Sequence, residues 1–340
     1  MGKPSPVSIC LLAILHETNA DLADLLQGLP EPDASQVERH IVAEELDKGI
    51  RVHFRYAKFD AQYNLTHGSL DEFETVIKTL RDGLSNLVKA PGQSESIKTD
   101  AVARAFLKAV ELWPRANPSD LWWFLVYRAY CDPYNHPAEF ARLDFTQSWK
   151  RTGGWALEEI LVRHYGPFLR GKGVNLVNLF IADGPSKQKL VQSLGLRDRI
   201  EADKIDMVLT GDTPQGPRFF GVVHVKASFA ERRTDDVPLS IALRSAGYTS
   251  PLWTMDCKST PSAQPLNRGE LGGIVGRRSA KRRDIEDEGY FTGCFSYNAN
   301  TVASPNNLPA AQRVYVCNFA SPDDVFSNFI LARWQAFRKS

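Results

Sequence analysis

The chain has 340 residues, of which 43% are hydrophobic and 24% are charged, and its formal net charge is +1. These values are ordinary for a folded protein, and they exclude disordered, collagen-like and coiled-coil chains. At about 150 residues per domain, the length predicts two or three domains. The apolar runs, such as residues 9–15, are far shorter than the roughly 18 residues that a membrane-spanning helix needs, so we expect no membrane association.

Cysteine and histidine usage gives no sign of a disulfide framework or a structural zinc site. The five cysteines are scattered and never spaced as CxxC, and the seven histidines form no HxxxH or HxH pair. Such usage is typical of a protein from a reducing cytoplasm.

Charge is distributed unevenly along the chain. Residues 151–340 carry 25 Lys and Arg against 19 Asp and Glu, a net charge of +6, whereas residues 1–150 carry a net charge of −5. A basic half suggests a polyanionic partner for that part of the chain. Chance variation across the surface is the alternative, because differences of this size are common.

Residues 1–150 are expected to form a mainly helical accessory domain. Ser69 and Glu72 form a capping-box pattern in front of apolar residues at helical spacing, and a second helix is expected from position 99 or 100 to Trp113. The aromatic-rich stretch at 119–127 is better explained by core packing than by base stacking. We find no recognisable chemistry in this half.

Residues 151–340 are expected to form an α/β domain with a mixed sheet flanked by helices. An amphipathic helix is predicted at 155–169, and a β-hairpin is predicted from strands at 205–209 and 218–225. The other predicted elements are strands at 174–181, 250–255 and 313–319, and helices at 186–194 and 323–337.

The hairpin carries the most informative pair of residues. Asp206 lies at the start of its first strand and Lys226 at the end of its second strand, so the two side chains can converge at one edge of the sheet. A carboxylate there can bind Mg²⁺, which activates water against a phosphodiester. A lysine can stabilise charge on the phosphate or assist the deprotonation of that water. The alternative is an accidental pairing of two structural residues.

The segment 204–238 resembles the nuclease core of the PD-(D/E)XK superfamily. Ile205-Asp206 stands at the PD position, and His224-Val225-Lys226 stands at the (D/E)XK position. Isoleucine in place of proline is common in that superfamily. Histidine in place of the second carboxylate means that one acidic metal ligand comes from elsewhere or is absent, a variation known in type II restriction endonucleases.

The residues after the lysine extend this resemblance. Lys226 is followed by Glu231-Arg232, which resembles the K-x-x-x-x-(D/E)-R motif of restriction endonucleases that read CC and GG base pairs, among them the EcoRII-like, NgoMIV-like and BsaWI-like groups. In that motif the acid accepts from cytosine N4 and the arginine donates to guanine, which agrees with the chemistry of both side chains. The alternative is a solvated charged pair after a strand.

Glu158 is our first candidate for the missing acid. It lies at the start of the predicted helix 155–169, a position where these nuclease cores often carry a glutamate directed towards the metal, so Asp206 and Glu158 are the predicted metal ligands. Glu159 lies about 100° further round the helix and ranks second. Asp235 and Asp236 rank lower because they lie closer to the lysine than the corresponding acid of NgoMIV-like enzymes. Either glutamate can instead complement the helix dipole.

His224 has two interpretations. It is a candidate catalytic residue that contacts the scissile phosphate or the attacking water. The alternative is an ordinary hydrogen-bonded histidine on a half-buried strand.

A run of basic residues at 277–283, in the C-terminal third of the chain, is its strongest cluster of charge. Five cations within seven residues suit contacts with DNA phosphates, which position a protein without reading sequence. A solvated loop and a nuclear import signal are the alternatives. Weaker candidates, for contacts with base edges, are Asn267, Arg268 and Glu270 in a glycine-flanked loop. The basic residues are Arg277, Arg278, Lys281, Arg282 and Arg283.

The resemblance implies a type II restriction endonuclease from a bacterial cytoplasm. Such an enzyme uses Mg²⁺ to hydrolyse double-stranded DNA at a short symmetric site, here one that contains CC and GG base pairs. A two-fold symmetric site implies a homodimer or a higher homo-oligomer. The alternatives are a sequence-specific DNA-binding protein with a degenerate, non-cleaving core and an unrelated α/β enzyme.

Overall fold

The computed structural model describes residues 38–56, 59–140, 144–179, 205–228, 233–258, 265–271 and 278–339. The helix predicted at 186–194 lies outside these residues. Within them, no helix combines the length and the apolar character that crossing a membrane requires.

The chain described here begins with a three-stranded antiparallel sheet, β1 (Ile41–Glu45), β2 (Ile50–Tyr56) and β3 (Phe59–Leu65), which the sequence analysis did not predict. In β2, the buried residues Ile50, Val52 and Phe54 alternate with half-buried polar residues, so one face of the sheet is apolar. That face packs on the helices, where Phe54 stacks on Phe124 at 5.9 Å. The alternation in β2 was the signal available in the sequence.

Helices then follow as predicted. Their bounds are α3 (Leu70–Leu84), α4 (Ser94–Leu112), α5 (Pro118–Asp120), the π-helical turn η4 (Leu121–Val126) and α6 (Tyr127–Cys131). The capping box at the start of α3 is confirmed, because Ser69 and Glu72 each accept a hydrogen bond from the other's backbone N–H. Packing is confirmed for the aromatic stretch, since Trp122 is buried against Phe106 and Trp149. Short 3₁₀ turns lie at Ser85–Leu87, Pro91–Gln93, Pro133–Asn135, Ala138–Phe140 and Ala310–Gln312.

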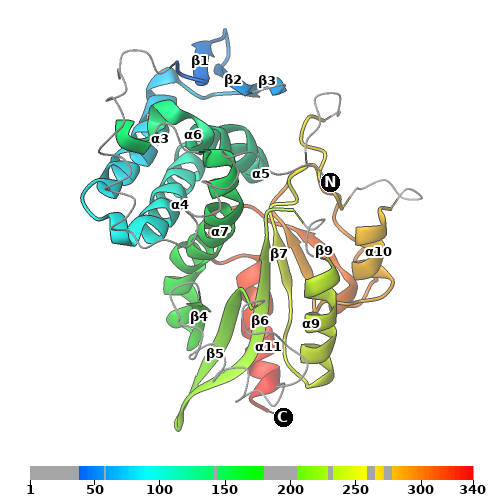
Figure 1. The fold of residues 1–340 in the computed structure, drawn as a ribbon. Helices are drawn as coiled ribbons and strands as arrows, with labels where there is room; N and C mark the ends of the chain where they lie inside the picture. Colours follow the sequence, from blue (N-terminus) through cyan, green and yellow to red (C-terminus); the bar gives the residue numbers. More distant parts are fainter. Residues whose placement is uncertain are drawn as a thin grey trace, which may run out of the picture.

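A long helix, α7 (Phe145–Arg170), joins the helical part to the sheet below it (Figure 1). Asp144 caps it by accepting from the backbone N–H groups of Thr146 and Gln147, so the helix starts ten residues before the predicted Trp155. The predicted boundary between residues 150 and 151 falls inside α7. The two parts therefore share a helix and one hydrophobic core at this point.

The second sheet has six strands in sequential order and is mixed, as predicted. The first three strands pair antiparallel, and β5 and β6 form the predicted hairpin through a turn at Pro214 and Gln215. The remaining strands add parallel to β6. The strands are β4 (Val174–Asn178), β5 (Met207–Thr213), β6 (Gly216–Lys226), β7 (Leu252–Thr254), β8 (Cys294–Ser296) and β9 (Val314–Val316).

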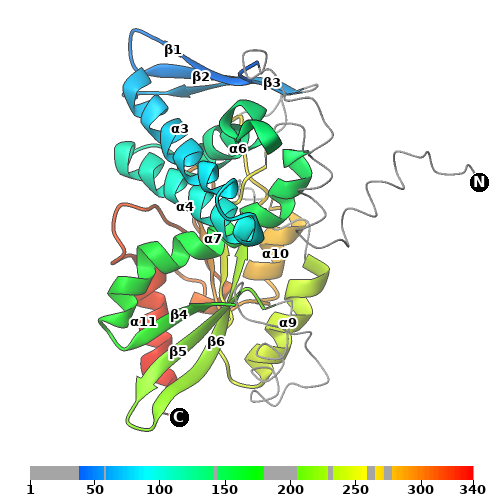
Figure 2. The same ribbon diagram turned by 60° about the vertical axis from the view of Figure 1, so that its left-hand side comes forward.

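Both faces of this sheet are covered by helices, which are α9 (Arg233–Ser245), α10 (Ala280–Glu286) and α11 (Val325–Phe337) besides α7. Figure 2 shows α7 and α11 on one side, and α9 and α10 on the other. On the second side, Val208 and Val222 pack in one cluster with Leu239 and Leu243 of α9. On the first side, Val223 belongs to the main core. Side chains of successive strand residues alternate between faces, so β5 and β6 are apolar on both.

Two glycines test this packing. A Cβ built at Gly211 of β5 would overlap the buried indole of Trp334 in α11, whereas a Cβ at Gly154 of α7 meets no atom within 4 Å. We expect Gly211→Ala to lower the free energy of unfolding by about 1–3 kcal/mol through overpacking. Gly154→Ala should raise it by about 1 kcal/mol, because alanine is the better helix former. Urea unfolding of both variants measures the two effects, and an unchanged stability for Gly211→Ala would contradict the packing described here.

Candidate active site

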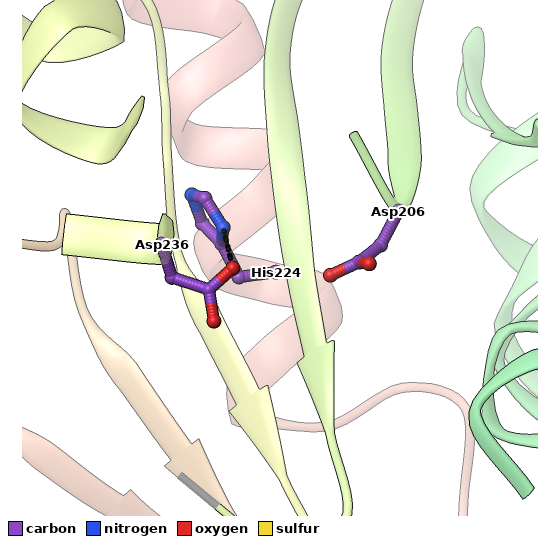
Figure 3. Close-up of side chains that lie close together, drawn as sticks. All are labelled: Asp206, His224 and Asp236. Carbon is purple, nitrogen blue, oxygen red and sulfur yellow. Dashed lines mark ion pairs between the residues drawn. The ribbon is translucent and has the colours of Figure 1, made fainter. Parts of the chain in front are cut away.

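Strand alternation gathers four polar side chains on the α9 side of the sheet. His224 and Lys226 follow Val222 at intervals of two residues along β6, so they share its face. Asp206 immediately precedes β5 and has the same parity as Val208. Asp236 lies in the first turn of α9, which packs on this face. Figure 3 shows the side chains of Asp206, His224 and Asp236 converging from the hairpin and from α9.

The ammonium group of Lys226 lies between two carboxylates. Lys226 Nζ donates to Asp206 Oδ2 at 2.6 Å and lies 3.4 Å from Asp236 Oδ1. The lysine side chain is 8% exposed, and those of Asp206 and Asp236 are 12% and 3% exposed. Charges this far from water interact strongly, and this cluster has two carboxylates beside one lysine ammonium.

Backbone and side-chain contacts fix both carboxylates. Asp206 Oδ2 also accepts from the backbone N–H of Val225 at 3.0 Å, which ties the start of β5 to the end of β6. Burial raises the pKa of the Asp236 carboxyl, but the contacts with His224 and Lys226 outweigh it and hold that pKa below its ordinary value. Asp236 is therefore ionised at neutral pH.

His224 supports this arrangement from inside the sheet. Its ring is fully buried, Nε2 hydrogen-bonds with Ser250 Oγ at 2.9 Å, and Nδ1 faces Asp236 Oδ1 at 3.5 Å (Figure 3). Phe291 packs edge-on against the ring at 5.3 Å between centroids. These contacts are those of a residue that orients a carboxylate, and they give the ring no surface towards solvent.

The cluster fits a divalent cation. The ligand atoms of Asp206, His224 and Asp236 all lie within 4.8 Å of one another. Asp236 Oδ2 is buried and has no hydrogen-bond partner among the described residues. Such an oxygen is costly to bury unless it binds something, and carboxylate oxygens are the ligands that Mg²⁺ prefers.

The structure does not bring Glu158 into this cluster. Glu158 is buried on α7, and Glu159 accepts from Arg163 at 2.7 Å on the same helix. Asp236, which the sequence analysis ranked lower, lies in the cluster beside Lys226. It is ten positions after Lys226 and belongs to α9. The Asp235 side chain lies outside the described part of the structure.

The predicted DNA-contacting residues are only partly described. Glu231, Arg232 and Arg277 lie outside the described residues, so their roles stay predictions. Arg278 and Arg283 are exposed, and Arg278 pairs with Asp287 at 2.6 Å.

Arg282 and Glu270 need correction, because both are turned inward. The Arg282 side chain is 4% exposed and bonded to Glu286 at 2.8 Å and to the Val302 carbonyl at 2.7 Å. A phosphate contact is therefore no longer assigned to Arg282. Glu270 is also buried, as is Asn267, which donates to Ser119 and Asp120, so neither side chain is presented to base edges.

Comparisons with known proteins find restriction enzymes. No family model matches the chain. The chain is 38% identical over 242 residues to the type II restriction enzyme AgeI of Thalassovita gelatinovora, which covers 69% of this chain and 84% of that enzyme. Among solved structures, the crystal structure of the specific AgeI–DNA complex matches with a TM-score of 0.72 and 34% identity over 83% of this chain and 99% of that one. The pre-specific BsaWI–DNA complex matches with a TM-score of 0.35 and 16% identity.

Metal titration distinguishes the two candidate acids. We expect Asp236→Asn to weaken Mn²⁺ binding by about tenfold or more, because it removes one carboxylate from the cluster. Glu158→Gln should have a smaller effect, and Glu159→Gln is the control on the same helix. Isothermal titration calorimetry measures all three. Loss of binding in Glu158→Gln with normal binding in Asp236→Asn would reverse the assignment.

Proposed function

This chain belongs to the type II restriction enzymes, and from that premise we propose that it hydrolyses double-stranded DNA with Mg²⁺ at a short symmetric site containing CC and GG base pairs. Family membership makes it a site-specific endonuclease of a restriction system. The metal, the base pairs read and the assembly are the proposed part.

One observation carries the proposed chemistry: the Lys226 ammonium lies between the carboxylates of Asp206 and Asp236 at the end of a strand. Sequence analysis paired Asp206 with Lys226, and α9 adds the second carboxylate. The non-cleaving alternative depended on histidine in place of that carboxylate at position 224. Because Asp236 lies 3.4 Å from Lys226 Nζ, the observed geometry favours cleavage over that alternative.

Each residue of the cluster has a distinct part in the proposed mechanism. Asp206 and Asp236 would hold the cation, and the cation when bound supplies stabilisation of the negative charge that develops on the phosphodiester. Lys226 carries three N–H donors, so it can keep its contact with Asp206 while it donates to a phosphate oxygen or to the attacking water. His224, held by Ser250, keeps Asp236 directed at the same point.

Base reading is assigned to Glu231 and Arg232. They follow Lys226 at the spacing of the motif found in enzymes that read CC and GG base pairs. A glutamate accepts from the amino group of cytosine, and an arginine donates to O6 and N7 of guanine in the major groove. The exposed Arg278 and Arg283, the half-buried Lys281, and Arg277 are proposed to contact phosphates, which adds affinity without selecting sequence.

A symmetric site supports a symmetric enzyme. Each copy of the chain carries the cluster at the end of β6, so two copies related by a two-fold axis would offer one cluster to each DNA strand. We therefore infer a homodimer on DNA, in which each copy reads one half-site.

Incubation with phage DNA tests the proposal. Wild-type protein should give discrete fragments with Mg²⁺ and none with EDTA. Asp206→Ala and Lys226→Ala should each slow cleavage by at least about 100-fold, because they remove charge aimed at the reacting phosphate.

Asp212→Ala is the matched control, because Asp212 is an exposed aspartate on β5, the strand that Asp206 immediately precedes. That variant should cut like wild type, and sequencing of the fragment ends gives the recognition site. Intact DNA with wild-type protein and Mg²⁺ would refute the proposed activity on that substrate.

A further inference from the structure

Glu270 is a buried carboxylate that joins three segments of the chain. It lies in the loop between β7 and α10, and its side chain is only 2% exposed. Oε1 pairs with Lys281 of α10 at 2.7 Å and with Lys258 at 3.1 Å, while Oε2 accepts from Ser228 Oγ at 2.8 Å. Burial raises the pKa of this carboxyl, but the three donors outweigh it and lower the pKa.

The backbone beneath Glu270 is itself held in place. Asp256, at the end of β7, accepts from the backbone N–H groups of Glu270 at 2.6 Å and Leu271 at 3.1 Å. Gly269 has φ of +75°, and a Cβ there would lie 2.5 Å from Asp256 Oδ2, so this close approach requires glycine. The carboxylate of Glu270 is thus presented from a fixed loop.

Ser228 connects this loop to the catalytic strand. It lies two residues after Lys226 and three residues before Glu231. The preceding residues are anchored to the chain after β7, since Met255 N–H donates to the Lys226 carbonyl and Cys257 N–H donates to the Ala227 carbonyl, both at 3.0 Å. The Ser228–Glu270 hydrogen bond is the side-chain contact that continues this anchoring towards Glu231.

We propose that Glu270 is a positioning residue for base discrimination. Its carboxylate fixes the start of the segment that leads from Lys226 to Glu231 and Arg232 against the two lysines, Lys258 and Lys281. Each lysine ammonium has further N–H donors that can bind DNA phosphates. Glu270 would therefore fix the residues that contact phosphates relative to the residues that read bases. This inference rests on the proposed function, since it assumes that Glu231 and Arg232 read bases.

Glu286 provides a matched control. It is buried to the same degree, at 3% exposed, and its carboxylate also binds two cations and one hydroxyl, those of Arg278, Arg282 and Ser304. These partners lie just before α10, within α10 and between β8 and β9, and none of them is on β6. A purely structural role predicts similar behaviour for Glu270→Gln and Glu286→Gln.

The experiment compares single-turnover cleavage of two duplexes by the full-length enzyme. One duplex carries the recognition site mapped with the wild-type enzyme. The other carries the same site with one C·G base pair of its CC/GG part replaced. We expect Glu270→Gln to reduce the ratio of the two rate constants by about tenfold, the size of one misplaced base contact. Glu286→Gln should leave the ratio unchanged, because altered phosphate contacts affect both duplexes alike. Thermal unfolding should show similar losses of Tm for both variants.

Ser228→Ala removes one hydrogen bond and keeps the charges, so it tests the same claim if Glu270→Gln fails to fold. It should reduce the ratio in the same direction. Equal ratios for Ser228→Ala, Glu286→Gln and wild type would overturn the positioning role while the proposed function stands. Absence of cleavage by the wild-type enzyme would overturn both.

Discussion

The ion pairing of Lys226 with Asp206 and Asp236 is the constraint on which the rest of the site depends. One ammonium between two nearly buried carboxylates is stable only when all three groups are held in place, because an uncompensated charge away from water is costly. Asp236 Oδ2, which has no hydrogen-bond partner among the described residues, makes the same cluster suited to a cation. Stability and the proposed catalysis therefore both require that these three side chains be held in this geometry.

Elements from three parts of the chain hold these side chains in place. The pairing of β5 with β6 brings Asp206 and Lys226 together, and the backbone N–H of Val225 also donates to the Asp206 carboxylate. Leu239 and Leu243 dock α9 on the hairpin, which carries Asp236 to the same face. Beyond β6, Asp256 and Glu270 anchor the chain that leads towards Glu231. The proposed catalytic and base-reading roles require rigid support of this kind.

The structural features that could be predicted from the sequence are those that depend on local patterns of residues. Strand alternation and a short turn are enough to place Asp206 and Lys226 on the same face at the same edge of the sheet, so that pair and the mixed sheet were predicted. The proximity of Asp236 to Lys226 was not predicted, because it depends on how α9 docks, a tertiary contact that spacing does not reveal. Arg282 was misassigned because its charge was visible and its burial was not, although Glu286 four residues later was a signal of an internal pair. The β1–β3 sheet was missed despite its alternation.

The most direct test of the central claim is a crystal of the protein with DNA and Mn²⁺, measured for anomalous scattering. The account predicts a Mn²⁺ peak flanked by the carboxylates of Asp206 and Asp236, with Lys226 beside the scissile phosphate. A peak bound by Glu158 without Asp236, or no peak at the end of β6, would contradict it.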